Sequence, residues 1–144
     1  MALPKSLRQL GYAGLLPQAA ALLVALDGRD WRWTALAVGF GYAALIFSFL
    51  GGVWWGIGVA RDDAPGWIFA VAVAPSLIAL AAYLPWIGGY AWPGPSLLVI
   101  GACLLLTPLV DRAIGFLPAG WLELRLRLSL GLGTMTLALG VLAL

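Results

Sequence analysis

The stretch that decides the fold is Ala44–Ala60, which reads ALIFSFLGGVWWGIGVA. It belongs to a longer run that has no charged residue between Arg32 and Arg61. An apolar run of this length predicts a membrane-spanning helix, because about 20 apolar residues cross the hydrocarbon core of a bilayer. Every fourth residue is small, and at helical spacing these residues form one small stripe: Ala44, Ser48, Gly52, Gly56 and Ala60. Because small residues let a neighbouring backbone approach, we predict that the stripe is the packing face at the hub of a helical bundle; the alternative is a contact face for another protein or copy.

The composition places the whole chain in a membrane. Of its 144 residues, 63% are hydrophobic and 10% are charged, and the mean hydropathy is +1.01, whereas a soluble domain is about 25% charged. The apolar runs are long, which favours helices over the short alternating segments of a transmembrane β-barrel. We therefore predict one all-α integral membrane domain over residues 1–144. Its five transmembrane helices are expected at about 10–26, 34–60, 67–87, 96–110 and 123–144.

The basic residues predict an orientation. Threading the five spans puts Arg29 and Arg32 on one side of the membrane and the other six Lys and Arg residues on the opposite side. Because cytoplasmic loops carry the excess of positive charge, we expect the amino terminus inside and the carboxyl terminus outside. Lys5 and Arg8 before an apolar run also resemble a signal peptide, but the possible cleavage site at Ala19–Ala21 falls inside that run. We therefore expect the run to stay as the first span.

The residue types that most often carry chemistry are scarce. The chain has no histidine and one cysteine, Cys103, which lies within an apolar run. These counts exclude an internal disulfide and a thiol metal site, and they remove the commonest general base and metal ligand. Neither a GxSxG motif nor a phosphate-binding loop occurs, and the basic residues form no cluster suited to nucleic acid. We expect a protein that is not an enzyme and has no cofactor, no metal and no nucleic-acid partner.

Polar residues near the middle of the spans predict a small pocket. Gln18, Ser48 and Ser76 lie in apolar runs, and a proline precedes both Gln18 and Ser76. Each proline is expected to interrupt its helix and free a carbonyl. On a helix, Trp54 points away from the small stripe and is expected to meet lipid, whereas Trp55 flanks the stripe. We predict a pocket between the first three spans, lined by Gln18, Ser48, Gly52, Trp55 and Ser76. Gln18 and Ser48 would hold a substrate or quinone headgroup there. The alternative is that the polar groups only form hydrogen bonds with one another.

Charged residues gather beside the fourth and fifth spans. The fourth apolar run is short and ends at Asp111, so we expect either that the bilayer thins locally or that the carboxylate is drawn inward and paired. Glu123 and Arg127 are four residues apart, which suits a salt bridge. Arg125 and Arg127 point in directions about 200° apart on a helix, so one of them turns inward, and we hypothesise an Asp111–Arg125 pair. These four residues form a predicted inner ion-pair network; the alternative is that they extend to the interface and contact anionic lipid.

Four motifs resemble those of a known family. They are LGYAGLLP over Leu10–Pro17, Tyr42 with SFLGGVWWG over Ser48–Gly56, APSL over Ala74–Leu77, and Asp111 with WLELRLRL over Trp121–Leu128. Together they make the chain similar to the transmembrane-protein-69-like family, a bacterial and mitochondrial membrane family carried as a domain of unknown function. The resemblance implies a bacterial inner-membrane location and no particular activity. Trp55 departs from the family pattern, which leads us to expect a smaller or polar aromatic residue such as histidine, so any chemistry of that histidine is missing here.

These observations lead to two functional expectations. The first is a non-catalytic inner-membrane protein that acts through helix–helix contacts, as an accessory, assembly or scaffold component of a membrane complex. The alternative is a binder or small carrier of a lipophilic molecule, such as a quinone, a lipid or a tetrapyrrole. The expected partners are membrane lipids and either another membrane protein or a second copy of the chain. A closed bundle with an exposed small stripe favours the first, and a cavity of roughly 300 Å³ or more between the first three spans favours the second.

Overall fold

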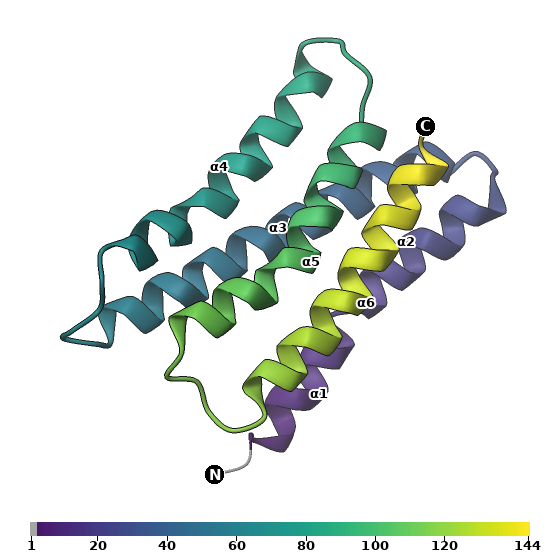
Figure 1. Ribbon diagram of the computed structural model, residues 1–144. Helices are drawn as coiled ribbons and strands as arrows, with labels where there is room; N and C mark the ends of the chain where they lie inside the picture. The colour runs from purple at the N-terminus through teal and green to yellow at the C-terminus, as the bar shows by residue number, and fades with distance from the viewer. Residues whose placement is uncertain (1–2) are drawn as a thin grey trace.

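The computed structural model describes residues 3–144, and over that range it is all-α (Figure 1). Its helices are α1 (Lys5–Ala13), α2 (Leu16–Asp27), α3 (Arg32–Val59), α4 (Trp67–Ile87), α5 (Gly94–Ile114) and α6 (Trp121–Leu142). Because α1 and α2 together make one span, the described residues contain five helical segments that are long and apolar enough to cross a membrane. The expectation of an all-α protein with five such segments is confirmed. The two chain ends lie at opposite ends of the bundle, which we call the amino-terminal and carboxyl-terminal ends (Figure 1).

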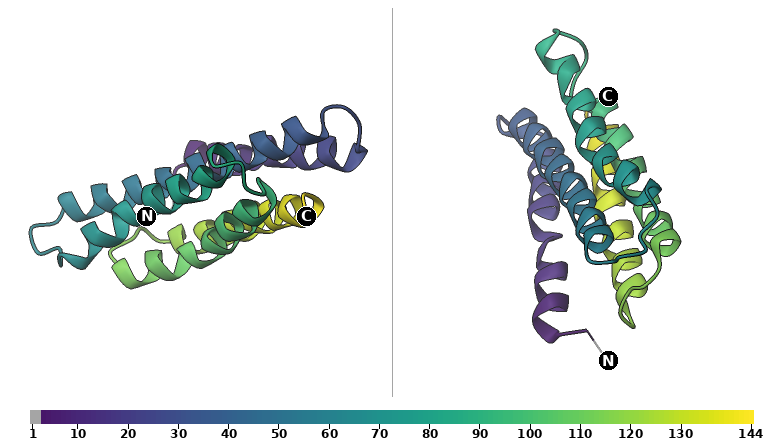
Figure 2. Two further views of the ribbon diagram at one scale, coloured as in Figure 1. Left: turned by 90° about the horizontal axis from the view of Figure 1, so that it is seen from above. Right: turned by 90° about the vertical axis from the view of Figure 1, so that its left-hand side faces the viewer.

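The first span is divided at Gly14 and Leu15, between α1 and α2. Pro17 lies in the first turn of α2, and because it has no N–H it cannot continue the hydrogen bonding of α1. The Tyr42 hydroxyl of α3 donates to the Gly14 carbonyl at 2.5 Å, which satisfies a backbone group at the break. Beyond the break, α2 packs on α3 and α6, whereas α1 packs mainly on α6. α1 therefore diverges from α3 toward the amino-terminal end (Figure 2, right).

The expected interruption of the third span is absent, because α4 runs unbroken from Trp67 to Ile87 with Pro75 inside it. Pro75 is buried and faces Gly51 of α3. A Cβ atom at Gly51 would lie 2.3 Å from the Ala72 carbonyl oxygen and 3.2 Å from Pro75 Cγ. The helix therefore tolerates its proline while α3 and α4 come into backbone contact, and this contact is possible only because residue 51 has no side chain.

The fourth span is longer than its apolar run. α5 begins at Gly94 and ends at Ile114, so Asp111 lies inside the helix instead of following it. α5 and α6 share the most extensive helix–helix contact among the described residues, and a Cβ atom at Gly133 would lie 3.2 Å from the Gly101 carbonyl oxygen. The sequence predicts a shorter span, because a charged residue normally ends one. Asp111 is instead buried and paired, and the helix continues past it.

The small stripe is not the packing hub, and that prediction is wrong. Gly52, Gly56 and Ala60 are exposed, and a Cβ atom at Gly52 or Gly56 would meet nothing within 4 Å. Ala44 and Ser48 are half-buried. The neighbouring face of α3 is buried instead, through Ala43, Phe47, Leu50, Gly51, Trp54 and Gly58. α3 is apolar on every side, so no polar face directs its packing, and the face with the larger side chains buries more contact surface.

Candidate functional site

A buried ion pair joins α5 and α6. Arg125 Nε donates to Asp111 Oδ2 at 3.0 Å, with the two side chains 7% and 1% exposed. The indole Nε1 of Trp54 on α3 donates to the other carboxylate oxygen, Asp111 Oδ1, at 2.9 Å. The structure thus contains the Asp111–Arg125 pair hypothesised from the sequence and adds Trp54, which the sequence did not connect to it. A charge buried among apolar helices needs such partners, because an unpaired one costs several kcal/mol, roughly.

Two hydroxyl groups complete this polar cluster. Arg125 Nη2 donates to Thr107 Oγ1 at 3.0 Å, and Thr107 in turn donates to the Leu104 carbonyl at 2.7 Å. The Ser129 hydroxyl lies 3.0 Å from Thr107 Oγ1. Because the Thr107 proton is used on Leu104, Ser129 is the donor in that contact. The cluster of Trp54, Thr107, Asp111, Arg125 and Ser129 connects α3 to the consecutive helices α5 and α6.

The other predicted ion pair is separate and superficial. Arg127 Nη2 donates to Glu123 Oε1 at 2.6 Å, and these side chains are 62% and 67% exposed. The four residues predicted to form one network therefore form two unconnected pairs. An exposed pair of this kind contributes about 1 kcal/mol at most, so the buried pair dominates the energetics.

The roles of the two adjacent tryptophans are reversed from the prediction. Trp54 is 2% exposed and hydrogen-bonded within the polar cluster, whereas Trp55 is 46% exposed and packs edge-on against Phe69 with ring centroids 5.1 Å apart. Helical geometry correctly predicts that the two side chains point in different directions. The inward and outward assignments were reversed because they assumed that the small stripe faces the inside of the bundle. Once the stripe faces outward, Trp55 follows it and Trp54 turns inward.

The predicted pocket is not assembled. Gln18 is fully buried, but its Nε2 donates to the Gly39 carbonyl at 3.1 Å and to Thr136 Oγ1 at 2.8 Å, which ties α2 to α3 and α6. Ser76 is exposed, like Gly52 and Trp55, and Ser48 is half-buried. These residues do not converge, because Gln18 lies against α6 while Ser76 lies on the outer side of α4. Gln18 Oε1 is buried and has no hydrogen-bond partner among the described residues.

A different cavity of about 420 Å³ lies between α1, α3 and α6, with α5 behind it. We call it the apolar slot. Most of its walls are leucine and isoleucine side chains, among them Leu7, Leu10, Ile46, Leu50, Leu128 and Leu132. None of the five residues predicted for a pocket lines it. The slot exists because α1, on the amino-terminal side of the break at Gly14, diverges from α3. The sequence signal for the slot was therefore the glycine and proline of the LGYAGLLP motif.

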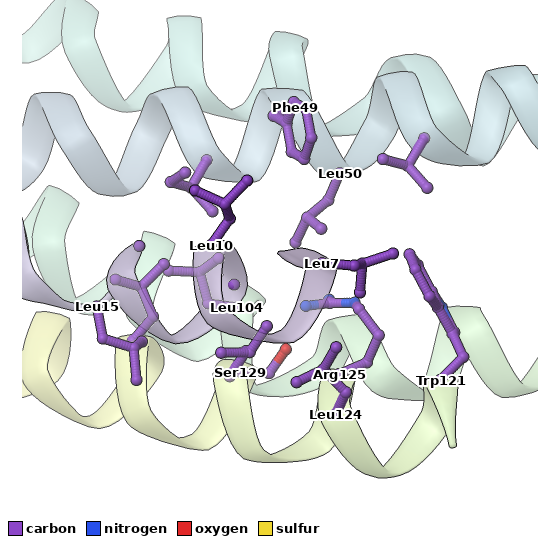
Figure 3. Close-up of a pocket in the computed structure, with 16 residues that line it drawn as sticks. Leu7, Leu10, Leu15, Phe49, Leu50, Leu104, Trp121, Leu124, Arg125 and Ser129 are labelled. Carbon is purple, nitrogen blue, oxygen red and sulfur yellow. The ribbon is translucent and has the colours of Figure 1, made fainter. Parts of the chain in front are cut away.

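The polar side chains of the slot, Arg125 and Ser129, come from the first half of α6, as does Trp121. Figure 3 shows Leu7, Arg125 and Trp121 together at one end, and Leu15 at the other. Arg125 lines the slot and uses Nε and Nη2 in the polar cluster, while its Nη1 makes no hydrogen bond within residues 3–144. Trp121 Nε1 is likewise buried and without a partner in that range. The slot is therefore amphipathic along its length, with unused donor capacity at the amino-terminal end.

Comparison with known proteins identifies the family but no activity. No curated protein and no solved structure matches the chain. A family model described as "Protein of unknown function (DUF3429)" matches residues 3–141, which is nearly the whole chain. Within residues 3–144, no group of three or more His, Cys, Asp or Glu side chains is placed to hold a metal ion. By the extent of that match, the chain belongs to the DUF3429 family of proteins of unknown function.

Proposed function

We propose that this protein binds a lipophilic molecule in the apolar slot and performs no catalysis. The observation that carries the proposal is the slot itself, a cavity of about 420 Å³ walled by apolar side chains with Arg125 at one end. Small-molecule sites are typically roughly 300–1,000 Å³, mostly apolar, with a few polar groups that fix orientation. The sequence analysis predicts a ligand pocket between the first three spans. The present proposal instead uses the slot between α1, α3 and α6.

The rim of the slot supports entry from the lipid phase. Leu10 of α1 and Phe49 of α3 both line the slot and are 73% and 65% exposed. In a membrane, apolar side chains on the outside of a bundle face acyl chains. A molecule already dissolved in the bilayer would therefore reach the slot sideways between α1 and α3, without crossing water.

The cellular setting is part of the proposal. We place the protein in a bacterial inner membrane with its amino terminus inside, which the distribution of Lys and Arg supports through the preference of positive charge for the cytoplasmic side. The narrower assignment to the transmembrane-protein-69-like family is supported by the quoted motifs and belongs to the proposal as well.

A contact function is the second candidate, and the exposed small stripe favours it. At Gly52 and Gly56 the backbone of α3 is open, so another transmembrane helix could approach it closely. In this reading the protein is an accessory or scaffold component, and its partner is a membrane protein or a second copy. The two candidates use different sides of α3, so variants on one side leave the other intact.

The slot proposal is tested with two adjacent residues of α3. Ile46 lines the slot, whereas Leu45 does not line it and is 70% exposed. We expect Ile46→Trp to fill the slot and release the lipophilic molecules that co-purify in mild detergent, as measured by native mass spectrometry. The matched variant Leu45→Trp should retain them. Equal retention by both folded variants and the unmodified protein would overturn the proposal.

A further inference from the structure

Two basic residues that make no ion pair within residues 3–144 lie in the first turns of α1, near the end of the slot that holds Arg125. Lys5 and Arg8 flank Leu7, a slot residue, in the first turns of α1. Both are exposed, and neither takes part in an ion pair within residues 3–144. The two acidic side chains of α5 and α6 are already paired, Asp111 with Arg125 and Glu123 with Arg127.

Two helix amino termini point the same way. α1 begins at Lys5 after Pro4, and α6 begins at Trp121 after Gly120, and no side chain caps either of them. Free N–H groups and the helix dipole make such termini favourable places for an anion. Leu7 and Trp121, from the first turns of these helices, both line the slot, so both termini lie at its amino-terminal end (Figure 3).

We infer that the molecule in the slot is an anionic phospholipid, an inference that rests on the proposed function. One acyl chain lies along the leucine-lined part of the slot toward Leu15 and Leu132. An ester carbonyl oxygen accepts a hydrogen bond from Arg125 Nη1, which makes no hydrogen bond within residues 3–144. The phosphate lies at the amino-terminal end, where Lys5, Arg8 and the two helix termini supply positive potential.

The arrangement of charges selects the anionic head group over a neutral one. The Asp111–Arg125 pair is neutral, so the carbonyl contact needs only a hydrogen-bond acceptor. Lys5 and Arg8 contribute two further positive charges. A quinone ring or a sterol has no negative charge to pair with them, whereas a phosphate has. Basic residues near the membrane surface attract anionic lipids, so we expect discrimination on the order of tenfold between anionic and zwitterionic lipids.

The experiment titrates the delipidated full-length protein with phosphatidylglycerol or phosphatidylcholine of identical acyl chains, read by native mass spectrometry. We expect phosphatidylglycerol to be retained about tenfold more strongly, with the preference falling as ionic strength rises. The double variant Lys5→Gln/Arg8→Gln should bind both lipids equally. The matched variant Arg29→Gln/Arg112→Gln removes the same charge from exposed residues outside the slot lining and should keep the preference.

The outcomes separate this inference from the proposed function. If Ile46→Trp empties the slot but the two lipids bind equally to the unmodified protein, the anionic head group is wrong and the slot remains a binding site. A preference that survives Lys5→Gln/Arg8→Gln also overturns the inference. If Ile46→Trp changes the retention of neither lipid, both the slot and its occupant are wrong. Arg125→Lys keeps the charge opposite Asp111 but removes the Nη1 donor, and it should weaken both lipids alike.

Discussion

The two halves of the first span differ in polarity and in packing, since α1 carries Lys5, Arg8 and Gln9 whereas α2 is mostly apolar. α2 buries Gln18, Ala21 and Ala25 against its neighbours, whereas α1 has no buried residue. The difference begins at Gly14, where the helix is interrupted ahead of Pro17. The apolar run over 10–26 therefore does not pack continuously, and the less buried half is the one that borders the slot.

The largest effect should come from Arg125 of α6, which lines the slot beside α1 and is also buried in the polar cluster. Arg125→Ala leaves Asp111 as an unpaired buried charge, which should destabilise the protein by about 3–5 kcal/mol or prevent folding. Thermal unfolding in detergent measures this. The exposed pair supplies the control, since Arg127→Ala should cost about 1 kcal/mol or less.

A charge-swapped pair sharpens that test. Asp111→Arg combined with Arg125→Asp should recover part of the stability that Arg125→Ala loses, although Trp54 Nε1 would then lose its acceptor. If Arg125→Ala unfolds at the same temperature as the unmodified protein, the pair contributes nothing and the polar cluster does not hold α5 to α6.

Adjacent glycines on α3 repeat the contrast between a packed and an open face. Gly51→Ala places a Cβ atom 2.3 Å from the Ala72 carbonyl oxygen, so α3 and α4 must separate, at a cost of about 1–3 kcal/mol. Gly52→Ala meets nothing within 4 Å and should be neutral or slightly stabilising, because alanine favours the helix. The comparison of unfolding temperatures is the measurement, and equal losses at both positions would contradict the assigned faces.

The two halves of the first span can be compared directly. Gln18→Ala removes the hydrogen bonds to Gly39 and Thr136 and should cost about 1–2 kcal/mol. Leu10→Ala on α1, where the side chain is 73% exposed, should change the stability by about 0.5 kcal/mol or less. A loss at Leu10 as large as that at Gln18 would mean that α1 is held more firmly than its burial indicates.

A small effect on stability, with a clear effect on binding, is expected from Pro17→Ala. The new N–H can complete the helical hydrogen bonding across the break, so α1 should align with α2 and narrow the slot. Stability should change by about 1 kcal/mol or less, while the amount of co-purified lipid falls. Native mass spectrometry measures the retained lipid, and unchanged retention would separate the slot from the proline break.

Some of the structure could be predicted because lipid imposes strong local rules. The number of spans follows from run length, since backbone groups in a bilayer must be satisfied within helices. The Asp111–Arg125 pair follows from charge, since a buried charge must find an opposite one. The direction of Trp54 and the lining of a pocket could not be predicted, because both depend on which side of an apolar helix meets its neighbours.

The sequence by itself determined that this chain forms five apolar helical segments and that Asp111 needs a partner. Only the tertiary structure decided that Gly51 packs while Gly52 does not, and that the space opens beside α1 and not around Gln18. The physical reason is that lipid is as apolar as leucine, so water does not mark one face of such a helix as the inside. The choice of face rests on close packing and a few hydrogen bonds between residues far apart in the chain, such as Gln18 with Thr136.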